Sequence, residues 1–141
     1  MLQQLFWGLI TALLLMILMP FLKKYLPAKL IAATILVAIG FIYVGFALKE
    51  NTTSDIVLEV IAALVFYFIA AIGFVKNPKL IAFGILLHGI WDFIHHLTPD
   101  MAVNPTYWPI YCLTIDVIWS IYFYNIFNKQ IKESKAETVT I

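Results

Sequence analysis

Five long apolar segments constrain the fold of this chain more than any other feature. A membrane-spanning α-helix needs ~20 predominantly apolar residues, and each segment reaches or nearly reaches that length. The segments cover residues 5–22, 30–48, 56–75, 80–97 and 108–127. The stretches between them contain proline, asparagine or charged residues, which are typical of the ends of membrane helices. We therefore predict an all-α fold, a polytopic membrane helical bundle with five transmembrane helices.

The composition supports the same class of protein. Hydrophobic residues make up 63% of the chain and charged residues 12%, whereas a soluble domain has about half and about a quarter respectively. The 141 residues fit one compact helical domain and leave no room for a second. We predict a single transmembrane domain over residues 1–128. Residues 129–141 are expected to form a polar cytoplasmic tail that is frayed or disordered.

The charged residues exclude several functions. The net charge is only +1, so no nucleic-acid partner is expected. All nine basic residues are lysines, and the absence of arginine removes the bidentate clamps that commonly hold phosphate or carboxylate groups. A nucleotide-binding function is therefore disfavoured. The single cysteine, Cys112, excludes a disulfide within the chain.

The lysines also predict the orientation of the helices. With five membrane crossings, eight of the nine lysines fall on one side and only Lys49 on the other. The positive-inside rule assigns the lysine-rich side to the cytoplasm, so the N-terminus is expected outside and the C-terminus in the cytoplasm. A model with four helices and one re-entrant segment would break this alternation. The eight are Lys23, Lys24, Lys29, Lys76, Lys79, Lys129, Lys132 and Lys135.

The first apolar segment is not expected to be a cleaved signal peptide. No basic residue precedes it, whereas Lys23 and Lys24 follow it, and this order is the reverse of that in a signal peptide. We interpret the segment as a retained helix. The predicted localisation is therefore the cell membrane, as an integral multi-pass protein.

The fourth apolar segment carries the strongest indication of chemistry, the run HGIWDFIHH. It contains His88, Asp92, His95 and His96, which include every histidine of the chain. Ionisable side chains at membrane depth are costly and usually functional. On a helix of 3.6 residues per turn, His88, Asp92 and His95 fall within a narrow stripe, and His96 follows Asp92 by four residues. One helix can therefore direct two or three ligands to a single point.

Two further acids belong to the same level of the membrane. Glu59 lies in the first outer turns of the third segment, and Asp116 lies about two turns inside the outer end of the fifth. The inner halves of the second to fifth segments have no ionisable residue apart from the flanking lysines. This asymmetry predicts one polar pocket, open to the outside, between the third, fourth and fifth segments.

Imidazole and carboxylate groups together suit a divalent metal, with zinc as the first expectation and iron as the second. We expect His88, Asp92, His95 and His96 as metal ligands. Asp116 and Glu59 are the expected catalytic residues, which would orient a histidine or act as general base on a metal-bound water. The predicted function is a membrane-embedded, hydrolase-like metalloenzyme whose apolar or lipid-like substrate enters from the outer leaflet.

Other functions remain open at this point. The cluster also suits a protein that binds or transports a metal ion, a proton or haem, or a structural subunit with a buried polar network. His95 and His96 in particular have a simpler explanation, because the C-terminal end of a helix dipole favours cations. The expected partners are the lipid bilayer and a lipid-like or small apolar ligand. Five helices are few for a monomeric transporter, so a homo-oligomer is also considered.

Three segments of the last third of the chain resemble a family of small bacterial integral-membrane proteins without an assigned function. These segments are HGIWDFIHH, NPTYWP and CLTID. The pattern of that family is H-x-x-W-D-x-x-H-H, then Trp-Pro, a cysteine, and an aspartate four residues later. The resemblance implies no activity. In this chain the pattern falls on His88, Trp91, Asp92, His95, His96, Trp108, Pro109, Cys112 and Asp116.

A looser similarity is to the alkaline ceramidase and adiponectin-receptor group of membrane hydrolases. That group places three histidines, an aspartate and a serine around zinc inside the membrane. The residue types are similar to those of His88, His95 or His96, and Asp116. The group has seven helices and distributes its histidines over several of them, whereas all three histidines here lie in one segment. The similarity implies a zinc hydrolase only by analogy.

Overall fold

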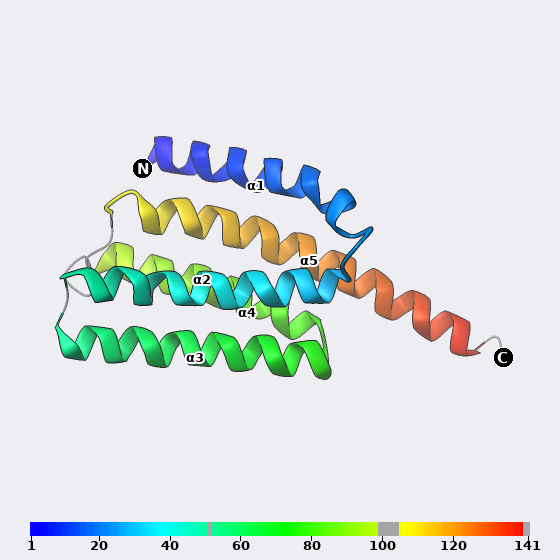
Figure 1. Cartoon of the computed structure of the whole chain (residues 1–141). Coiled ribbons are helices and arrows are strands. Elements are labelled where there is room, and N and C mark those ends of the chain that lie inside the picture. The colour runs from blue at the N-terminus through cyan, green and yellow to red at the C-terminus, as the bar shows by residue number, and fades with distance from the viewer. Residues whose placement is uncertain (51, 99–104, 140–141) are drawn as a thin grey trace.

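The computed structural model describes residues 1–50, 52–98 and 105–139, and these residues form an all-helical fold (Figure 1). All five helices are long and apolar enough to cross a membrane. No strand occurs in the described part of the chain. The prediction of an all-α chain with five helices of membrane length is thus confirmed. The helices are α1 (Leu2–Leu22), α2 (Ala28–Glu50), α3 (Thr53–Val75), α4 (Lys79–Leu97) and α5 (Trp108–Val139).

The last helix is longer than the sequence predicts. Residues 129–139, expected to be frayed or disordered, continue α5 as regular helix, so that expectation is wrong within the described residues. The reason is local, because this stretch has no glycine or proline and is rich in lysine and glutamate, which favour helix. Lys129 and Glu133 also form an exposed i,i+4 ion pair of 3.8 Å. The low hydropathy of this stretch excludes it from the predicted membrane segment, but the helix itself continues through it.

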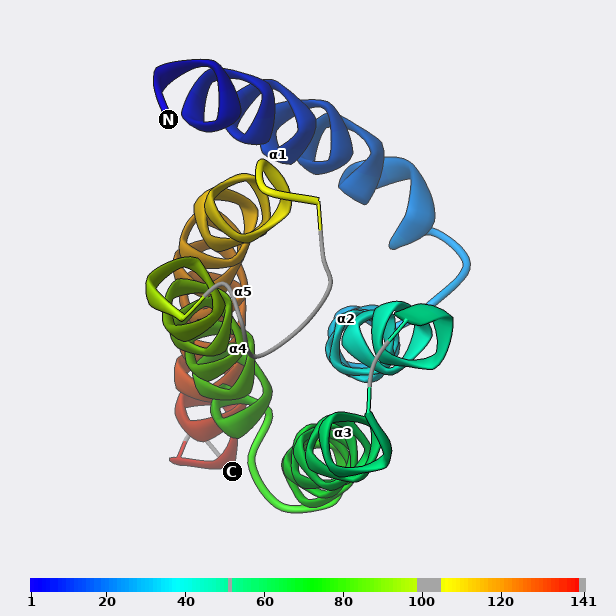
Figure 2. The same ribbon diagram turned by 90° about the vertical axis from the view of Figure 1, so that its left-hand side faces the viewer.

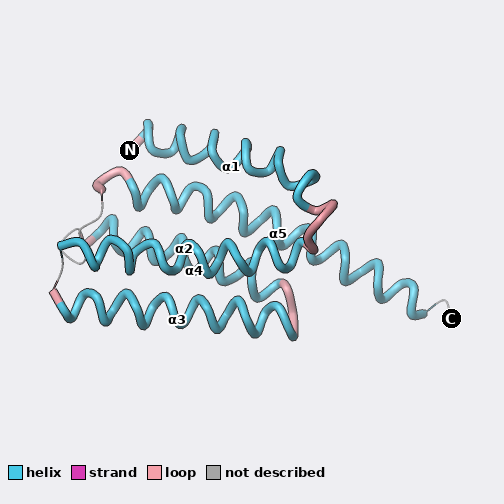
Figure 3. The backbone as a smooth tube through the Cα atoms, in the orientation of Figure 1, coloured by secondary structure: helices cyan, strands magenta, loops and turns pink. Residues whose placement is uncertain are grey.

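The helices run alternately up and down (Figures 1 and 3). The N-terminus and the first turns of α3 and α5 lie at one end of the bundle, while the last turns of α1 and α3 and the C-terminal end of α5 lie at the other. This arrangement places the eight lysines named above at or toward the same end. We call that end the lysine-rich end and the opposite one the lysine-poor end.

The five helices pack as two close pairs with one helix alongside. Helix α4 packs against α5, and α2 packs against α3, while α1 lies along α5 (Figure 2). Helix α4 also contacts both α2 and α3, so it occupies the centre of the fold. Toward the lysine-rich end, the helices enclose an apolar core that leaves little room for a polar path. Its fully buried side chains include Leu36, Ile81, Ile85, Phe123 and Phe127.

A glycine sets the close approach between α4 and α5. A Cβ atom at Gly89 would lie 3.1 Å from the Cβ of Asp116, which is tighter than ordinary packing. The absence of a side chain at this position therefore lets α5 bring Asp116 against the face of α4 that carries His88. A larger residue here would separate the two helices at the level of the polar residues.

Candidate functional site

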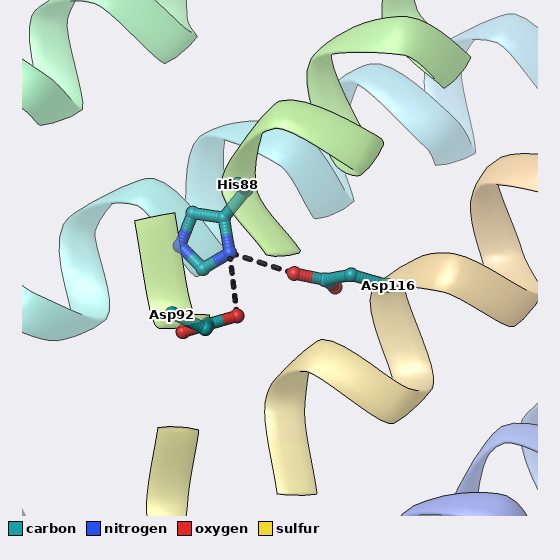
Figure 4. Close-up of side chains that lie close together, drawn as sticks. All are labelled: His88, Asp92 and Asp116. Atoms are coloured by element: carbon teal, nitrogen blue, oxygen red, sulfur yellow. Dashed lines mark hydrogen bonds and ion pairs between the residues drawn. The ribbon is translucent and has the colours of Figure 1, made fainter. Parts of the chain in front are cut away.

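Three predicted site residues lie close together, as Figure 4 shows. His88 and Asp92 lie on α4 and Asp116 lies on α5, and one ligand atom from each falls within 4.8 Å of the others. His88 Nδ1 is 2.7 Å from Asp116 Oδ2 and 3.4 Å from Asp92 Oδ2. The exposed fractions of His88, Asp92 and Asp116 are 2%, 0% and 2%. We call these three residues the His88 cluster.

The ring of His88 is held by a backbone group on α2. Its Nε2 lies 3.1 Å from the carbonyl oxygen of Ile39. A carbonyl oxygen can only accept a hydrogen bond, so Nε2 carries the hydrogen and donates it. The other nitrogen, Nδ1, is thereby turned toward the two carboxylates. Metal-binding histidines are commonly oriented in this way, with one nitrogen anchored and the other available as a ligand.

Asp92 is oriented by Tyr43 of α2. The Tyr43 hydroxyl donates a hydrogen bond of 2.7 Å to Asp92 Oδ1. The second oxygen, Oδ2, has no hydrogen-bond partner among the described residues, although it is completely buried. A buried carboxylate oxygen without a hydrogen bond is costly, so its presence calls for an explanation. A bound cation is one explanation, because it would supply the missing interaction.

The charges of the His88 cluster do not balance without an additional positive charge. Among the described residues, the three side chains of the cluster form ion pairs only with one another. Two ionised carboxylates beside one imidazole leave at least one negative charge in a low-dielectric interior, where uncompensated charge is strongly disfavoured. A divalent cation bound beside a neutral imidazole would balance both carboxylates. Two protons would do the same.

A second histidine–carboxylate cluster lies beside the first. His95 Nε2 is 2.8 Å from Glu59 Oε1, and the Trp91 indole donates to Glu59 Oε2 over 3.3 Å. The other ring nitrogen of His95 donates to the backbone carbonyl of Trp91 at 2.9 Å. Each polar atom of the His95 and Glu59 side chains therefore has a partner. We call His95, Glu59 and Trp91 the His95 cluster.

Tyr43 connects the two clusters. Its ring packs against the His95 ring with a centroid separation of 4.2 Å, while its hydroxyl group binds Asp92 of the His88 cluster. Tyr43 is itself almost completely buried. Tyr43 therefore links the two clusters through one hydrogen bond and one ring contact.

The structure brings together five of the six residues that the sequence singled out. His88, Asp92 and Asp116 form one cluster, while His95 and Glu59 form the core of another. His96 is exposed on the outside of α4 and belongs to neither. Successive residues on a helix point about 100° apart, so His95 and His96 cannot both face the interior.

Sequence reasoning missed Tyr43 and with it the contribution of α2 to the site. A usable signal existed, because Tyr43 lies about two turns from the lysine-poor end of α2, and Asp92 lies at a similar depth in α4. A hydroxyl group at the level of a buried carboxylate is a natural partner for it. The pocket expected between the third, fourth and fifth helices, open to the outside, is instead a set of buried polar residues to which four helices contribute.

One cavity reaches the His88 cluster from the side of α1. It has a volume of about 280 Å³ and lies between α1, α2 and α5. Asp116 and Cys112 are part of its wall, so a small molecule in this space would lie next to the cluster. Cys112 is not among the converging ligand atoms. The remaining wall residues are Thr11, Leu15, Ile35, Ala38, Ile39, Ile42, Trp108, Tyr111, Ile115 and Trp119.

Five apolar helices of membrane length around a buried histidine–aspartate cluster are typical of a multi-pass α-helical membrane protein. The chain belongs to a family of unknown function (DUF6010), which it matches over residues 3–129. The matched region contains both clusters and ends where the polar part of α5 begins. No curated protein and no solved structure matches the chain. The family thus supplies no activity, and a function has to be argued from the site.

Proposed function

We propose that the protein is a membrane-embedded, hydrolase-like enzyme that depends on a divalent metal bound by His88, Asp92 and Asp116. One observation carries this proposal: the completely buried Asp92 Oδ2 has no hydrogen-bond partner among the described residues, yet it lies beside His88 Nδ1 and a second carboxylate. Three protein ligands with a further position left for water or substrate are typical of catalytic zinc sites.

The proposal changes the roles expected from the sequence. Asp116, expected as a catalytic residue, becomes a ligand, because one of its oxygens lies within 4.8 Å of ligand atoms of both His88 and Asp92. Every polar side-chain atom of His95 and Glu59 already has a hydrogen-bond partner. Neither residue is therefore available as a metal ligand while these hydrogen bonds are intact. His96 has no place in the site, because it is exposed on the outer face of α4.

The donor set supports zinc first, with iron as the second choice, because both accept imidazole and carboxylate ligands. A divalent metal in such a site would polarise a substrate carbonyl or lower the pKa of a bound water. The protein residues supply the orientation. The Ile39 carbonyl holds the His88 ring, and the Tyr43 hydroxyl holds the Asp92 carboxylate.

The surroundings of the site favour an apolar or amphipathic substrate. The cavity beside Asp116 is walled mainly by aliphatic and aromatic side chains of α1, α2 and α5. In the orientation expected from the lysines, with the N-terminus outside and the C-terminus in the cytoplasm, the site lies in the outer half of the membrane. A substrate would then reach it from the outer leaflet.

Metal analysis of the purified protein tests this proposal. We expect about one zinc or iron ion per chain in protein purified in mild detergent without chelators. His88→Ala should lose the metal, because it removes the only imidazole of the cluster. His96→Ala is the matched control, since it removes an exposed imidazole from the same helix, and it should keep the metal. A folded wild-type protein that binds no metal after zinc or iron is added would contradict the proposal.

A second candidate function is a proton-carrying or structural network without metal. The observation that favours it is the short distance of His88 to Asp116, 2.7 Å, and of His95 to Glu59, 2.8 Å. In this alternative, one proton between the histidine nitrogen and the carboxylate oxygen would stabilise each pair. This alternative predicts that chelators leave the thermal stability unchanged, whereas a metal centre predicts a chelator-dependent loss of stability.

A further inference from the structure

We infer that the cavity beside Asp116 and a second cavity at the lysine-poor end of the bundle together bind one long-chain amphiphile with an uncharged polar head. The inference deepens the proposed function, on which it rests for the role of the His88 cluster. The binding site itself is argued from the cavities, from an unpaired indole and from the distribution of charge.

The second cavity lies next to the first. It has a volume of about 440 Å³ and is formed by the first turns of α1 and the residues around the start of α5. Trp108 and Tyr111 line both cavities. The two spaces therefore adjoin at these side chains, and we treat them as two parts of one elongated site of a size common for small-ligand pockets.

The lining changes in character along this site. The outer cavity presents the side-chain amides of Gln3 and Gln4 together with aromatic residues. The inner cavity ends against aliphatic residues such as Leu15 and Ile35. An amphiphile fits this gradient with its polar head in the outer cavity and its hydrocarbon chain in the inner one.

An unpaired donor is present where the two cavities meet. Trp108 Nε1 is buried and has no hydrogen-bond partner among the described residues. Buried indole N–H groups usually have a partner. Trp119 also lines the inner cavity but differs from Trp108, because its Nε1 donates to the Ala12 carbonyl over 3.4 Å. An acceptor oxygen in the head of the ligand would satisfy Trp108.

The distribution of charge indicates an uncharged head. None of the described residues that line the outer cavity is charged. Lys49 is the one lysine assigned to the lysine-poor end of the bundle, and it does not line this cavity. A phosphate head would lack the lysine or arginine partners that buried phosphates require. Amides, phenols and indoles suit hydroxyl or carbonyl groups instead.

The packing of α1 provides a lateral entrance. Among the described residues, α1 packs along α5 but makes no close backbone contact with α2, although both helices line the inner cavity. We therefore place the entrance for the lipid between α1 and α2. Asp116 follows Trp108 by about two helical turns, or ~12 Å along the axis. The hydrocarbon chain of a ligand whose head contacts Trp108 therefore extends toward the His88 cluster.

Binding of radiolabelled 1-oleoylglycerol to the purified full-length protein tests the inference. We expect saturable binding to the wild type. The competitor 1-oleoyl lysophosphatidic acid, which has the same chain and a phosphate in place of one hydroxyl, should bind at least about tenfold more weakly, because its charge would be buried without a partner. Equal or tighter binding of the phosphorylated lipid would overturn the uncharged-head assignment.

Two variants of α2 locate the binding site. Ile35→Trp places bulk in the inner cavity and should lower the affinity at least about tenfold. Val37→Trp is the matched control, because this residue is partly buried on the same helix but lines the groove between α2 and α3 and not the inner cavity. Its affinity should stay within about twofold of wild type. Equal affinity in both variants would indicate lipid bound only at the annular surface and would overturn the inference.

Trp108→Phe tests the unpaired donor. We expect an affinity about three- to tenfold lower, corresponding to one lost hydrogen bond. Trp119→Phe is the control, because its N–H group is already committed to Ala12. A loss of affinity in Trp119→Phe but not in Trp108→Phe would contradict the role of Trp108.

The same binding assay separates this inference from the metal proposal when it is repeated on chelator-treated protein. Lipid binding that persists in protein shown to hold no metal supports the site while the metal proposal fails. Normal metal content together with no saturable lipid binding overturns the inference and leaves the metal proposal intact.

Discussion

The His88 and His95 clusters are built from the same parts but differ in how completely they are satisfied. Each has a histidine of α4 facing an acid of a neighbouring helix, at 2.7 Å in one case and 2.8 Å in the other. In the His95 cluster, every polar side-chain atom of His95 and Glu59 has a partner. The His88 cluster has an additional carboxylate, with one oxygen left without a hydrogen bond among the described residues.

This difference indicates different roles for the two clusters. The His95 cluster, in which the polar atoms of His95 and Glu59 all have partners, stabilises the contact between α3 and α4 and does not need a ligand. An open cluster with surplus negative charge is destabilising until a cation or protons neutralise it. Variants of the two clusters should therefore differ in stability, in metal content and even in the sign of their effects.

The largest effect is expected from breaking the closed pair. Glu59→Ala leaves His95 and the Trp91 indole without their shared acceptor in a buried position. We expect a loss of about 3–5 kcal/mol in the free energy of unfolding, measured by unfolding in increasing fractions of denaturing detergent. The metal content per folded chain should not change. A loss of metal in this variant would show that the two clusters act as one site.

Asp92→Asn should have an effect that depends on the metal. In chelated protein, the variant removes surplus negative charge while its amide oxygen still accepts from Tyr43, so its stability should equal or exceed that of chelated wild type. With metal at about 100 times the dissociation constant, wild type should gain about 2.7 kcal/mol that the variant lacks. Thermal unfolding with and without metal measures both comparisons. A variant that is less stable than wild type without metal would argue against surplus charge.

Gly89→Ala should increase the separation of α4 and α5 at the His88 cluster. The added Cβ would lie 3.1 Å from the Cβ of Asp116, so α4 and α5 must move apart, at a cost of about 1–3 kcal/mol in stability. Metal affinity should fall as well, because His88 and Asp116 lie on the two separated helices. Gly45→Ala is the control, because an added Cβ there meets nothing within 4 Å, and it should be neutral or slightly stabilising. Similar effects at both positions would contradict this explanation.

The smallest effect on stability is expected from Tyr43→Phe. The variant keeps the ring that packs on His95 but removes the hydroxyl that orients Asp92. We expect a loss of about 1 kcal/mol in stability and a metal affinity about 10- to 100-fold lower, as for other residues that orient metal ligands. Metal titration followed by calorimetry measures the second effect. An unchanged affinity would show that Tyr43 serves packing alone.

Much of the fold could be predicted from the sequence because apolar length is a direct requirement of the membrane interior. The ends of α3 and α4 near Val75 and Leu97 agree with the predicted segments. The helical continuation of α5 to Val139 could not be inferred from hydropathy, since a helix that leaves an apolar environment can continue where local propensity favours it. The predicted membrane insertion and orientation follow from composition and the lysines alone.

The sequence predicted the depth of the site residues in the membrane, but not which acid contacts which histidine. Spacing along α4 placed His88, Asp92 and His95 on one face, and their level in the membrane related them to Glu59 and Asp116. Which acid contacts which histidine depends on the rotation and spacing of neighbouring helices, as the close approach at Gly89 shows. The choice between His95 and His96 depends on the same rotation. Tyr43 was missed because a single tyrosine in an apolar helix is usually a packing residue.

X-ray absorption spectroscopy of the metal-loaded protein tests the central claim most directly, because it counts the imidazole ligands of the bound ion. The His88 cluster offers one imidazole and two carboxylates. We therefore predict a spectrum with a single imidazole and otherwise oxygen ligands, unchanged in His96→Ala. A first coordination sphere with two or more imidazoles, or a folded protein that binds no metal at all, would contradict the account.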